Sequence, residues 1–244
     1  MNEREYLRKE KYYGQETAAF LADCQRLEAG EPLAYVIGTI PFLDCEITLD
    51  SKPLIPRPET EWWVERAIVE IKKSAAAKPP RILDLCAGSG CIGVAVAKAI
   101  SDAQVDFAEL EAVHIATIEK NCERNNIAGE RYQIYTGDLF QNVTQTYDFI
   151  LTNPPYIDPI LDRTERSVKD FEPDVALYGG ADGMEVIRQI IETAPQYLNP
   201  GGQLWIEHEP EQSKAIKELA KNSFTTTTHS DQYQVERYSQ LVLQ

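Results

Sequence analysis

Residues 153–156, Asn-Pro-Pro-Tyr, combine groups that can hold a planar amino group. They directly follow an apolar segment that reads as a buried strand. Each proline fixes its own φ angle and restricts the residue before it, so Asn153 is held extended where the strand ends. Neither proline has an N–H group. The Asn153 side-chain carbonyl and the Pro154 backbone carbonyl can therefore both accept hydrogen bonds from one NH2 group, while Tyr156 stacks on the planar group that carries it.

This arrangement suits the methylation of an unreactive nitrogen. The lone pair of an amide or aromatic NH2 belongs to a π system, which makes the nitrogen a poor nucleophile. Two fixed acceptors favour a tetrahedral nitrogen as it attacks, so binding strengthens towards the transition state, and positioning against an electrophilic methyl group supplies the rest. The predicted catalytic and substrate-binding residues are Asn153, Pro154, Pro155 and Tyr156. The structural alternative is a strand-ending Pro-Pro turn with a buried tyrosine.

A glycine-rich loop between a predicted strand and a predicted helix indicates a second site. Gly88, Gly90 and Gly93 fit the pattern G-x-G-x-x-G within residues 84–93. Glycine permits a tight turn and a close approach of a ligand to the backbone, and the following helix start offers free N–H groups. The pattern alone is weak, and its strand–loop–helix context strengthens it. A glycine turn without a ligand is the alternative.

Two acidic residues flank this loop and limit the choice of ligand. Glu109 ends the next predicted strand, about twenty residues further on, where an acid can hold both hydroxyls of a ribose. That position suits NAD and S-adenosylmethionine alike. Asp84 precedes the glycines, and its carboxylate can favour a cationic group such as a sulfonium or can tie down the loop backbone.

The surrounding sequence predicts the sheet that must position both segments. Strand and helix patterns alternate from residue 81 onwards, which is typical of a Rossmann-like, doubly wound α/β fold. We expect a mostly parallel sheet of seven strands, with an antiparallel edge strand because the last two strands adjoin. The predicted strands are 81–86, 103–110, 132–138, 147–153, 203–209, 224–230 and 237–244. The predicted helices of this part are 91–100, 111–125, 183–198 and 211–221.

A low-complexity stretch, residues 72–80, divides the chain. We expect an N-terminal helical region with a linking strand or hairpin-like connection over residues 1–75, and a catalytic domain over 76–244. The first region should hold a long helix over 3–28, a strand over 42–50 and a helix over 56–73. Pro58 lies in the first turn of that last helix, as helix starts favour.

Composition excludes several classes of function. The chain has 244 residues and a net charge of −15, which argues against stable nucleic-acid binding because such binding rests on basic side chains. No apolar run is long enough to cross a bilayer, and the N-terminus shows no secretory signal. Five scattered cysteines and three widely separated histidines predict neither disulfides nor a metal site. We therefore expect a reduced cytoplasmic protein.

Several segments resemble the class I S-adenosylmethionine-dependent methyltransferases and, more narrowly, the peptide chain release factor N5-glutamine methyltransferases. The Asn-Pro-Pro-Tyr stretch is shared with enzymes that methylate amino groups of DNA, whereas 55–61 (IPRPETE) and 172–183 (EPDVALYGGADG) are much more specific to the narrower family. The matching segments are 30–38 (GEPLAYVIG), 53–65 (PLIPRPETEWWVE), 82–93 (ILDLCAGSGCIG), 137–140 (GDLF), 153–157 (NPPYI), 171–183 (FEPDVALYGGADG) and 201–212 (GGQLWIEHEPEQ).

The resemblance implies S-adenosylmethionine as cofactor and a release factor as protein partner. The methyl acceptor would be the side-chain amide nitrogen of the glutamine in the Gly-Gly-Gln tripeptide of that factor. Arg57 would lie near the mouth of the cleft as a further substrate contact. The cofactor-binding residues would be Asp84, Cys86, Ala87, Gly88, Ser89, Gly90, Glu109, Asp138, Leu139 and Asn153.

The sequence departs from the family pattern in three places. Only 29 residues precede the segment that starts at Gly30, where the family has a longer helical bundle, although the resemblance implies that the N-terminal region over 1–75 docks the release factor. Glu109 stands where Asp is usual, and Glu209 stands where Gly is usual. The charged stretch 162–174 is either a solvated loop or, in the functional interpretation, a mobile lid or a release-factor contact.

Other functions remain open from the sequence. One is methylation of a glutamine in a ribosomal protein, and another is N6-adenine or N4-cytosine methylation of nucleic acid. A nicotinamide-dependent oxidoreductase would share the glycine loop and Glu109 but leaves residues 153–156 unexplained. A binding module that has kept the fold without catalysis is the last alternative.

Overall fold

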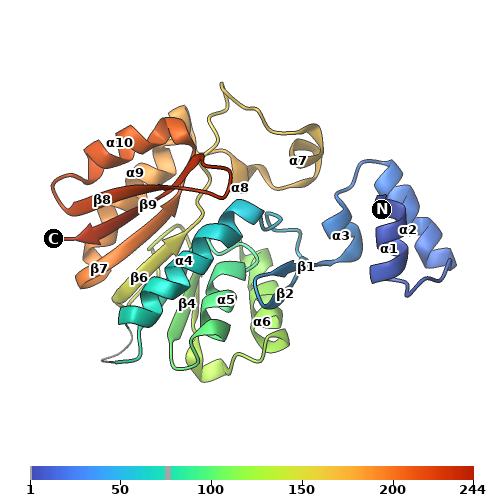
Figure 1. The fold of residues 1–244 in the computed structure, drawn as a ribbon, viewed down its shortest axis with the longest axis horizontal. Coiled ribbons are helices and arrows are strands. Elements are labelled where there is room, and N and C mark those ends of the chain that lie inside the picture. The colour runs from blue at the N-terminus through green and yellow to red at the C-terminus, as the bar shows by residue number, and fades with distance from the viewer. Residues whose placement is uncertain (1, 75–77) are drawn as a thin grey trace.

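The computed structural model describes residues 2–74 and 78–244, and a seven-stranded sheet forms its centre (Figure 1). The strand order is β5-β4-β3-β6-β7-β9-β8. The chain starts in the middle of the sheet and winds outwards in both directions, as a doubly wound fold does. The strands are β3 (Arg81–Leu85), β4 (Gln104–Glu109), β5 (Ile134–Thr136), β6 (Tyr147–Thr152), β7 (Leu198–Glu207), β8 (Phe224–Ser230) and β9 (Glu236–Leu243).

The pairing confirms the predicted mostly parallel sheet. Neighbouring strands from β5 to β7 run parallel, whereas β9 pairs antiparallel with both β7 and β8. The last two strands form the expected hairpin, so the antiparallel pairing lies at this edge of the sheet. Because parallel strands end on the same side, β3, β4, β6 and β7 bring their carboxyl ends to one rim.

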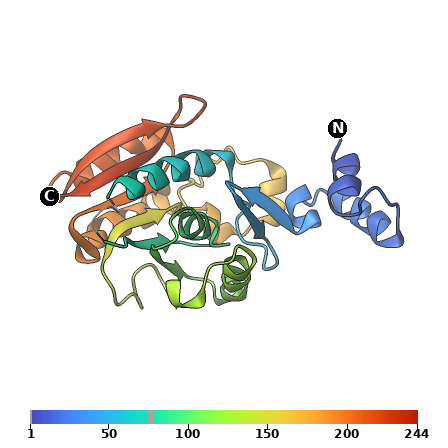
Figure 2. The ribbon, with the colours of Figure 1, turned by 60° about the horizontal axis from the view of Figure 1, so that its bottom comes forward.

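Alternating side chains of the strands build a core on each face of the sheet. Ile82 and Phe149 point into one cluster, and their neighbours Leu83 and Ile150 point into the other. This period of two is what a sheet covered on both faces requires. Helices α4 (Pro58–Ser74), α5 (Cys91–Ala99) and α6 (Ile115–Arg124) cover the first face. Helices α9 (Glu185–Thr193) and α10 (Ser213–Ala220) cover the second (Figure 2).

Two predicted helices are shorter than expected. The helix predicted over 111–125 begins only at Ile115, after a 3-10 turn at Ala112–His114. The helix predicted over 183–198 spans Glu185–Thr193 and ends in a second 3-10 turn that contains Pro195, which has no N–H group to continue the helix. Strand β7 consequently starts before the Pro-Gly-Gly turn at 200–202 that was expected to precede it.

The long N-terminal helix predicted over 3–28 is wrong. The structure has two helices, α1 (Glu3–Glu10) and α2 (Ala18–Glu28), because Tyr13 and Gly14 have φ angles of 52° and 84° that an α-helix cannot accommodate. The hydroxyl of Thr17 then caps α2 by accepting the Phe20 N–H at 3.2 Å. These two helices lie at the opposite end of the molecule from the C-terminus (Figures 1 and 2).

The strand predicted over 42–50 is half of a hairpin. Strands β1 (Thr39–Phe42) and β2 (Cys45–Thr48) pair antiparallel around a turn in which Leu43 has a φ angle of 49°. Asn121 on α6 accepts the Thr48 N–H at 2.7 Å and donates to the Thr48 carbonyl at 3.1 Å and the Ser89 carbonyl at 2.8 Å. This side chain therefore joins the hairpin to the glycine loop.

Helix α4 packs on the sheet, although the predicted boundary at residue 75 places it with the N-terminal region. Trp63 and Val64 are fully buried in the same cluster as Ile82 and Phe149. The boundary itself stays a prediction. Among the helices that the structure describes, none has the length and apolar character of a bilayer-spanning segment.

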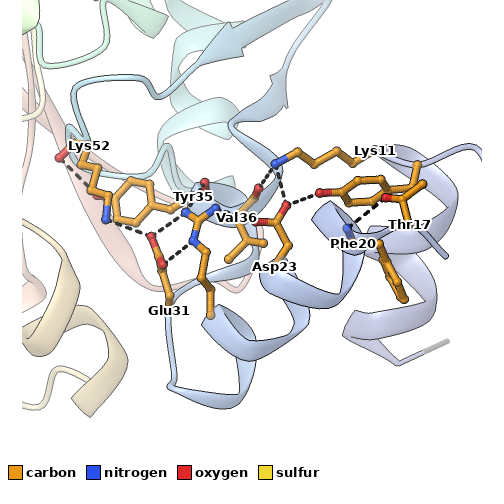
Figure 3. Close-up of polar contacts among 10 residues, drawn as sticks. Lys11, Thr17, Phe20, Asp23, Glu31, Tyr35, Val36 and Lys52 are labelled. Atoms are coloured by element: carbon orange, nitrogen blue, oxygen red, sulfur yellow. Dashed lines mark hydrogen bonds and ion pairs between the residues drawn. The ribbon is translucent and has the colours of Figure 1, made fainter. Parts of the chain in front are cut away.

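A chain of ion pairs fixes the N-terminal helices to the rest of the molecule (Figure 3). Helix α3 (Leu33–Ile37) follows α2, and the carboxylate of Glu31 just before it pairs with Arg26 at 2.8 Å and Lys52 at 2.9 Å. The Tyr35 hydroxyl donates to the Pro53 carbonyl at 2.6 Å. The ion pairs of Glu31 thus connect α2 to Lys52, which lies in the segment between β2 and α4.

We predict that Glu31→Gln loosens this attachment. Hydrogen bonds from Arg26 and Lys52 lower the pKa of Glu31 to about 2, so its stabilisation is complete above about pH 4.5 and is lost as pH falls towards 2. Both cations are partly exposed, so we expect a loss of only about 1 kcal/mol. Amide exchange in α2 at neutral pH should quicken about fivefold. Glu28→Gln, at the exposed end of the same helix, is the control, and equal exchange in both variants would contradict the attachment.

Candidate active site

The Asn-Pro-Pro-Tyr stretch begins where β6 ends, beside the end of β7. Thr152 pairs with Ile206 in the sheet, so Asn153 and Glu207 are the next residues of the two strands. The backbone then leaves the sheet, because the prolines offer no N–H group for further pairing. Asn153 is partly exposed and Pro154 is buried.

Two cavities meet at this point. The first, of about 460 Å³, is lined by Arg57, Asn153 and Tyr156 among others. The second, of about 210 Å³, is lined by Asn153, Pro155 and the glycine loop. Asn153 is a wall of both, as are Leu54 and Ala176, whereas Pro154 lines neither. Groups bound in the two cavities would therefore approach each other at Asn153.

The glycine loop is shaped as its pattern requires. Gly90 has a φ angle of 76°, and a Cβ atom there would lie 3.1 Å from Cγ2 of Ile118. Gly93 lies inside α5, where a Cβ atom would come within 2.3 Å of the Phe107 ring. Gly90 makes the turn and Gly93 allows α5 to pack tightly on β4, two of the roles that glycines have in this pattern. Gly88 then faces the second cavity.

Glu109 holds the glycine loop from the end of β4. Its Oε2 atom accepts the Gly88 N–H at 2.7 Å and its Oε1 atom accepts the Glu111 N–H at 2.9 Å. The side chain also lines the second cavity. It thus presents a carboxylate to the cavity in a fixed orientation, as a ribose would require.

The predicted cofactor residues divide into two groups. Those that line the second cavity are Cys86, Gly88, Glu109, Asp138, Leu139 and Asn153. Those that shape the loop without lining it are Asp84, Ala87, Ser89 and Gly90.

Asp84 lies under the loop and is fully buried. Its Oδ2 atom accepts the Gly93 N–H at 2.8 Å, which anchors the start of α5, while Oδ1 has no partner among the described residues. Burial raises the pKa of this carboxyl well above its usual value. Of the two roles expected from the sequence, the contacts support that of tying down the loop backbone.

Glu207 is a buried carboxylate that lines neither cavity but contacts Tyr156, which lines the first, and sequence reasoning missed it. Its Oε2 atom accepts hydrogen bonds from Thr60 Oγ1 at 2.8 Å and Trp63 Nε1 at 2.6 Å. Its Oε1 atom accepts from the Tyr156 hydroxyl at 3.0 Å. Burial raises the pKa of Glu207, and these three donors act against that rise. An acid placed directly after the apolar run 204–206, at the carboxyl end of a predicted strand, was the available signal.

Two groups near the cavities are held in their neutral forms. Burial raises the pKa of the Cys86 thiol to about 12, so it is not a thiolate at neutral pH. Burial and the Glu207 carboxylate raise the pKa of Tyr156 well above 10. Neither group can therefore act as a charged nucleophile or base near neutral pH.

Arg57 reaches the first cavity, but its guanidinium is already paired. Nη2 donates to Glu172 Oε1 at 2.6 Å, and Glu172 Oε2 accepts the Ile55 N–H at 2.9 Å. Glu172 follows α7 (Arg166–Phe171) in the charged stretch that was expected to be a loop or lid. These contacts of Glu172 attach the stretch 162–174 to the segment before α4. It was not foreseen because the two partners lie far apart in the sequence.

Glu209 and His114 also have defined places. Glu209 has an ordinary φ angle of −73° and forms a reciprocal cap with Gln212, so this position does not need the glycine usual in the family. His114 lines the second cavity and bonds through Nδ1 to Ser51 Oγ at 2.8 Å, as expected for a satisfied histidine. Within residues 2–74 and 78–244, no group of three acidic, histidine or cysteine side chains has the geometry of a metal site.

The fold and this pair of cavities define an S-adenosylmethionine-dependent methyltransferase. The residues fit the cofactor, because a carboxylate faces the cavity beside a glycine loop, and Leu139 and Pro155 offer apolar surface. The chain matches the family model described as Methyltransferase small domain over residues 68–169. A methyltransferase from Pyrococcus furiosus has the same fold, with a TM-score of 0.60 and 20% identity over 91% of this chain and 98% of that one.

The chain belongs to the release factor glutamine methyltransferase family. A curated relative of that name from Geobacter sulfurreducens is 40% identical over 193 residues, which cover 77% of this chain and 65% of the relative. Another from Rhodopirellula baltica is 36% identical over 213 residues, which cover 86% of this chain and 72% of the relative.

We predict that Glu109→Gln weakens cofactor binding. A glutamine can accept only one of the two backbone N–H groups, and its own NH2 group then faces the other as a second donor. The dissociation constant for S-adenosylhomocysteine should rise about tenfold, as expected for the loss of a charged acceptor. Calorimetry of wild type, Glu109→Gln and the exposed control Asp102→Asn measures this, and unchanged affinity in Glu109→Gln would refute the role.

Proposed function

We propose that this protein transfers a methyl group from S-adenosylmethionine to the side-chain amide nitrogen of a glutamine. The acceptor is the glutamine of the Gly-Gly-Gln tripeptide in a peptide chain release factor. The observation that carries the proposal is the position of Asn153 between the two cavities, one beside the glycine loop and one open to a second ligand. The family membership supplies the substrate.

The division of labour between the cavities follows from their linings. Glu109, Gly88 and Leu139 face the second cavity and would hold the cofactor, which supplies an electrophilic methyl group on a sulfonium. Tyr156 and Arg57 face the first cavity, where the glutamine would enter. Asn153 Oδ1 and the Pro154 carbonyl would accept hydrogen bonds from the amide NH2 group as its nitrogen becomes tetrahedral.

The chemical step is a direct transfer. The cofactor, held by Glu109 and the glycine loop, would supply the methyl group and keep the electron pair of its carbon–sulfur bond, and the amide nitrogen would gain the methyl carbon and lose one proton. The chain's contribution is orientation of the amide and stabilisation of the charge that develops on its nitrogen. The neutral Tyr156 ring offers a surface for the planar amide.

The charge of the first cavity favours a protein substrate over a nucleic acid. Phosphate groups would meet carboxylates there, and Arg57 and Arg163 are each paired with a glutamate. The acidic residues of its lining are Asp158, Glu165, Asp182, Glu209 and Glu211.

We expect Asn153→Ala to abolish methyl transfer while leaving the cofactor in place. Losing one oriented acceptor should lower kcat about a hundredfold or more, as removal of a transition-state hydrogen bond does elsewhere. The affinity for S-adenosylhomocysteine should stay within about threefold, because Glu109 and the glycine loop remain. Radiolabelled methyl transfer and calorimetry measure the two effects, and an unchanged turnover would remove the assigned role.

The substrate is tested with purified release factor, its Gln→Ala variant at Gly-Gly-Gln and duplex DNA. We expect the methyl group on the glutamine of the unaltered factor alone, located by peptide mass spectrometry. Methylation of the Gln→Ala variant would place the acceptor elsewhere, and methylation of DNA alone would favour an amino-methylating nucleic-acid enzyme.

A further inference from the structure

The side-chain amide of Asn153 has two possible orientations, and only one of them suits its role. With Oδ1 facing the substrate, Asn153 accepts a hydrogen bond from the incoming NH2 group. In the flipped orientation, the NH2 group of Asn153 would face the NH2 group of the substrate, so two hydrogen-bond donors would face each other. The two orientations have nearly the same shape, so packing alone does not choose between them.

One hydroxyl group makes the choice. Asn153 Nδ2 donates to Thr60 Oγ1 at 3.1 Å, and Thr60 Oγ1 donates to Glu207 Oε2 at 2.8 Å. A hydroxyl has a single proton. Because Thr60 donates this proton in its hydrogen bond to Glu207, Thr60 can only accept a hydrogen bond from Asn153. The group of Asn153 that faces Thr60 must then be its NH2 group, which leaves Oδ1 for the substrate side.

These two hydrogen bonds, from Asn153 to Thr60 and from Thr60 to Glu207, form a relay. The direction of this relay does not depend on whether Glu207 is ionised. Trp63 Nε1–H, which can only donate, also points at Oε2, at 2.6 Å. A proton on the carboxyl is best placed on Oε1, where the Tyr156 oxygen at 3.0 Å can accept it. In both states Oε2 remains the acceptor for Thr60.

We propose that Thr60 is a positioning residue that fixes the orientation of the Asn153 amide, with its own hydroxyl oriented by Glu207. Thr60 is buried at the start of α4 and lines neither cavity, so it acts through Asn153 and not on the substrate. The relay makes the start of α4 part of the catalytic apparatus. Its activity test rests on the proposed function, whereas its spectroscopic test does not.

The activity test compares Thr60→Val with Thr60→Ser. Valine keeps the shape and removes the hydroxyl, so kcat should fall about tenfold or more while KM for S-adenosylmethionine stays within about twofold. Serine keeps the hydroxyl and should retain most of kcat. Thr226→Val removes a buried hydroxyl that has no partner among the described residues, on the distant strand β8, and controls for the substitution itself.

Two outcomes would overturn the proposal in active enzyme. One is wild-type kcat in Thr60→Val, and the other is an equal loss in Thr60→Ser, which would mark a packing role. Combining Thr60→Val with Asn153→Ala should add little to the loss from Asn153→Ala alone, because Thr60 acts only through that residue. Additive losses would show a separate effect of Thr60.

A spectroscopic test needs no substrate. In 15N-labelled protein, the Asn153 side-chain NH2 signals, assigned by their disappearance in Asn153→Ala, should exchange with solvent about tenfold faster in Thr60→Val than in wild type or Thr60→Ser. Equal exchange in all three would refute the hydrogen bond. If wild type leaves release factor unmethylated but shows this difference, the proposed function fails and the relay stands.

Discussion

The burial of one carboxylate, Glu207, at the ends of two parallel strands organises the active site. An unpaired charge in such a position would be costly, and the pKa of Glu207 is raised by its burial. Three donors satisfy it, and they come from separate parts of the chain: Thr60 and Trp63 at the start of α4, and Tyr156 beyond β6. Satisfying this charge therefore brings together α4, β6 and β7 at the point where the two cavities meet.

On the cofactor side, too, buried polar side chains are satisfied by hydrogen bonds, and most of these bonds are to backbone groups. Asp84 holds the Gly93 N–H, Asn121 holds the Ser89 carbonyl and Glu109 holds the Gly88 N–H. The loop is thus held by side chains from β3, from α6 and from the end of β4, with Gly88 facing the cavity. A site fixed in this way needs little rearrangement when a ligand enters, which is the basis of electrostatic preorganisation.

The sequence predicted those features that depend on local pattern. Residues 153–156, the glycine loop and Glu109 have signals in residue type and spacing, and the seven strands follow from alternating apolar segments. What it missed depends on contacts between distant segments. Glu172 meets Arg57, and Thr60 meets Glu207, only because the sheet places them together. The break at Tyr13 and Gly14 was missed because helical periodicity continues on both sides of a turn set by positive φ angles.

We propose that Asn153, which lines both cavities, and the backbone carbonyl of the buried Pro154, which lines neither, act together as acceptors for a substrate amide. A crystal structure with S-adenosylhomocysteine and a Gly-Gly-Gln peptide tests it directly. The glutamine side-chain nitrogen should lie within about 3 Å of both Asn153 Oδ1 and the Pro154 carbonyl oxygen, a hydrogen-bond distance, and in line with the sulfur. A glutamine bound elsewhere, or an Asn153 whose Oδ1 points to Thr60, would contradict it.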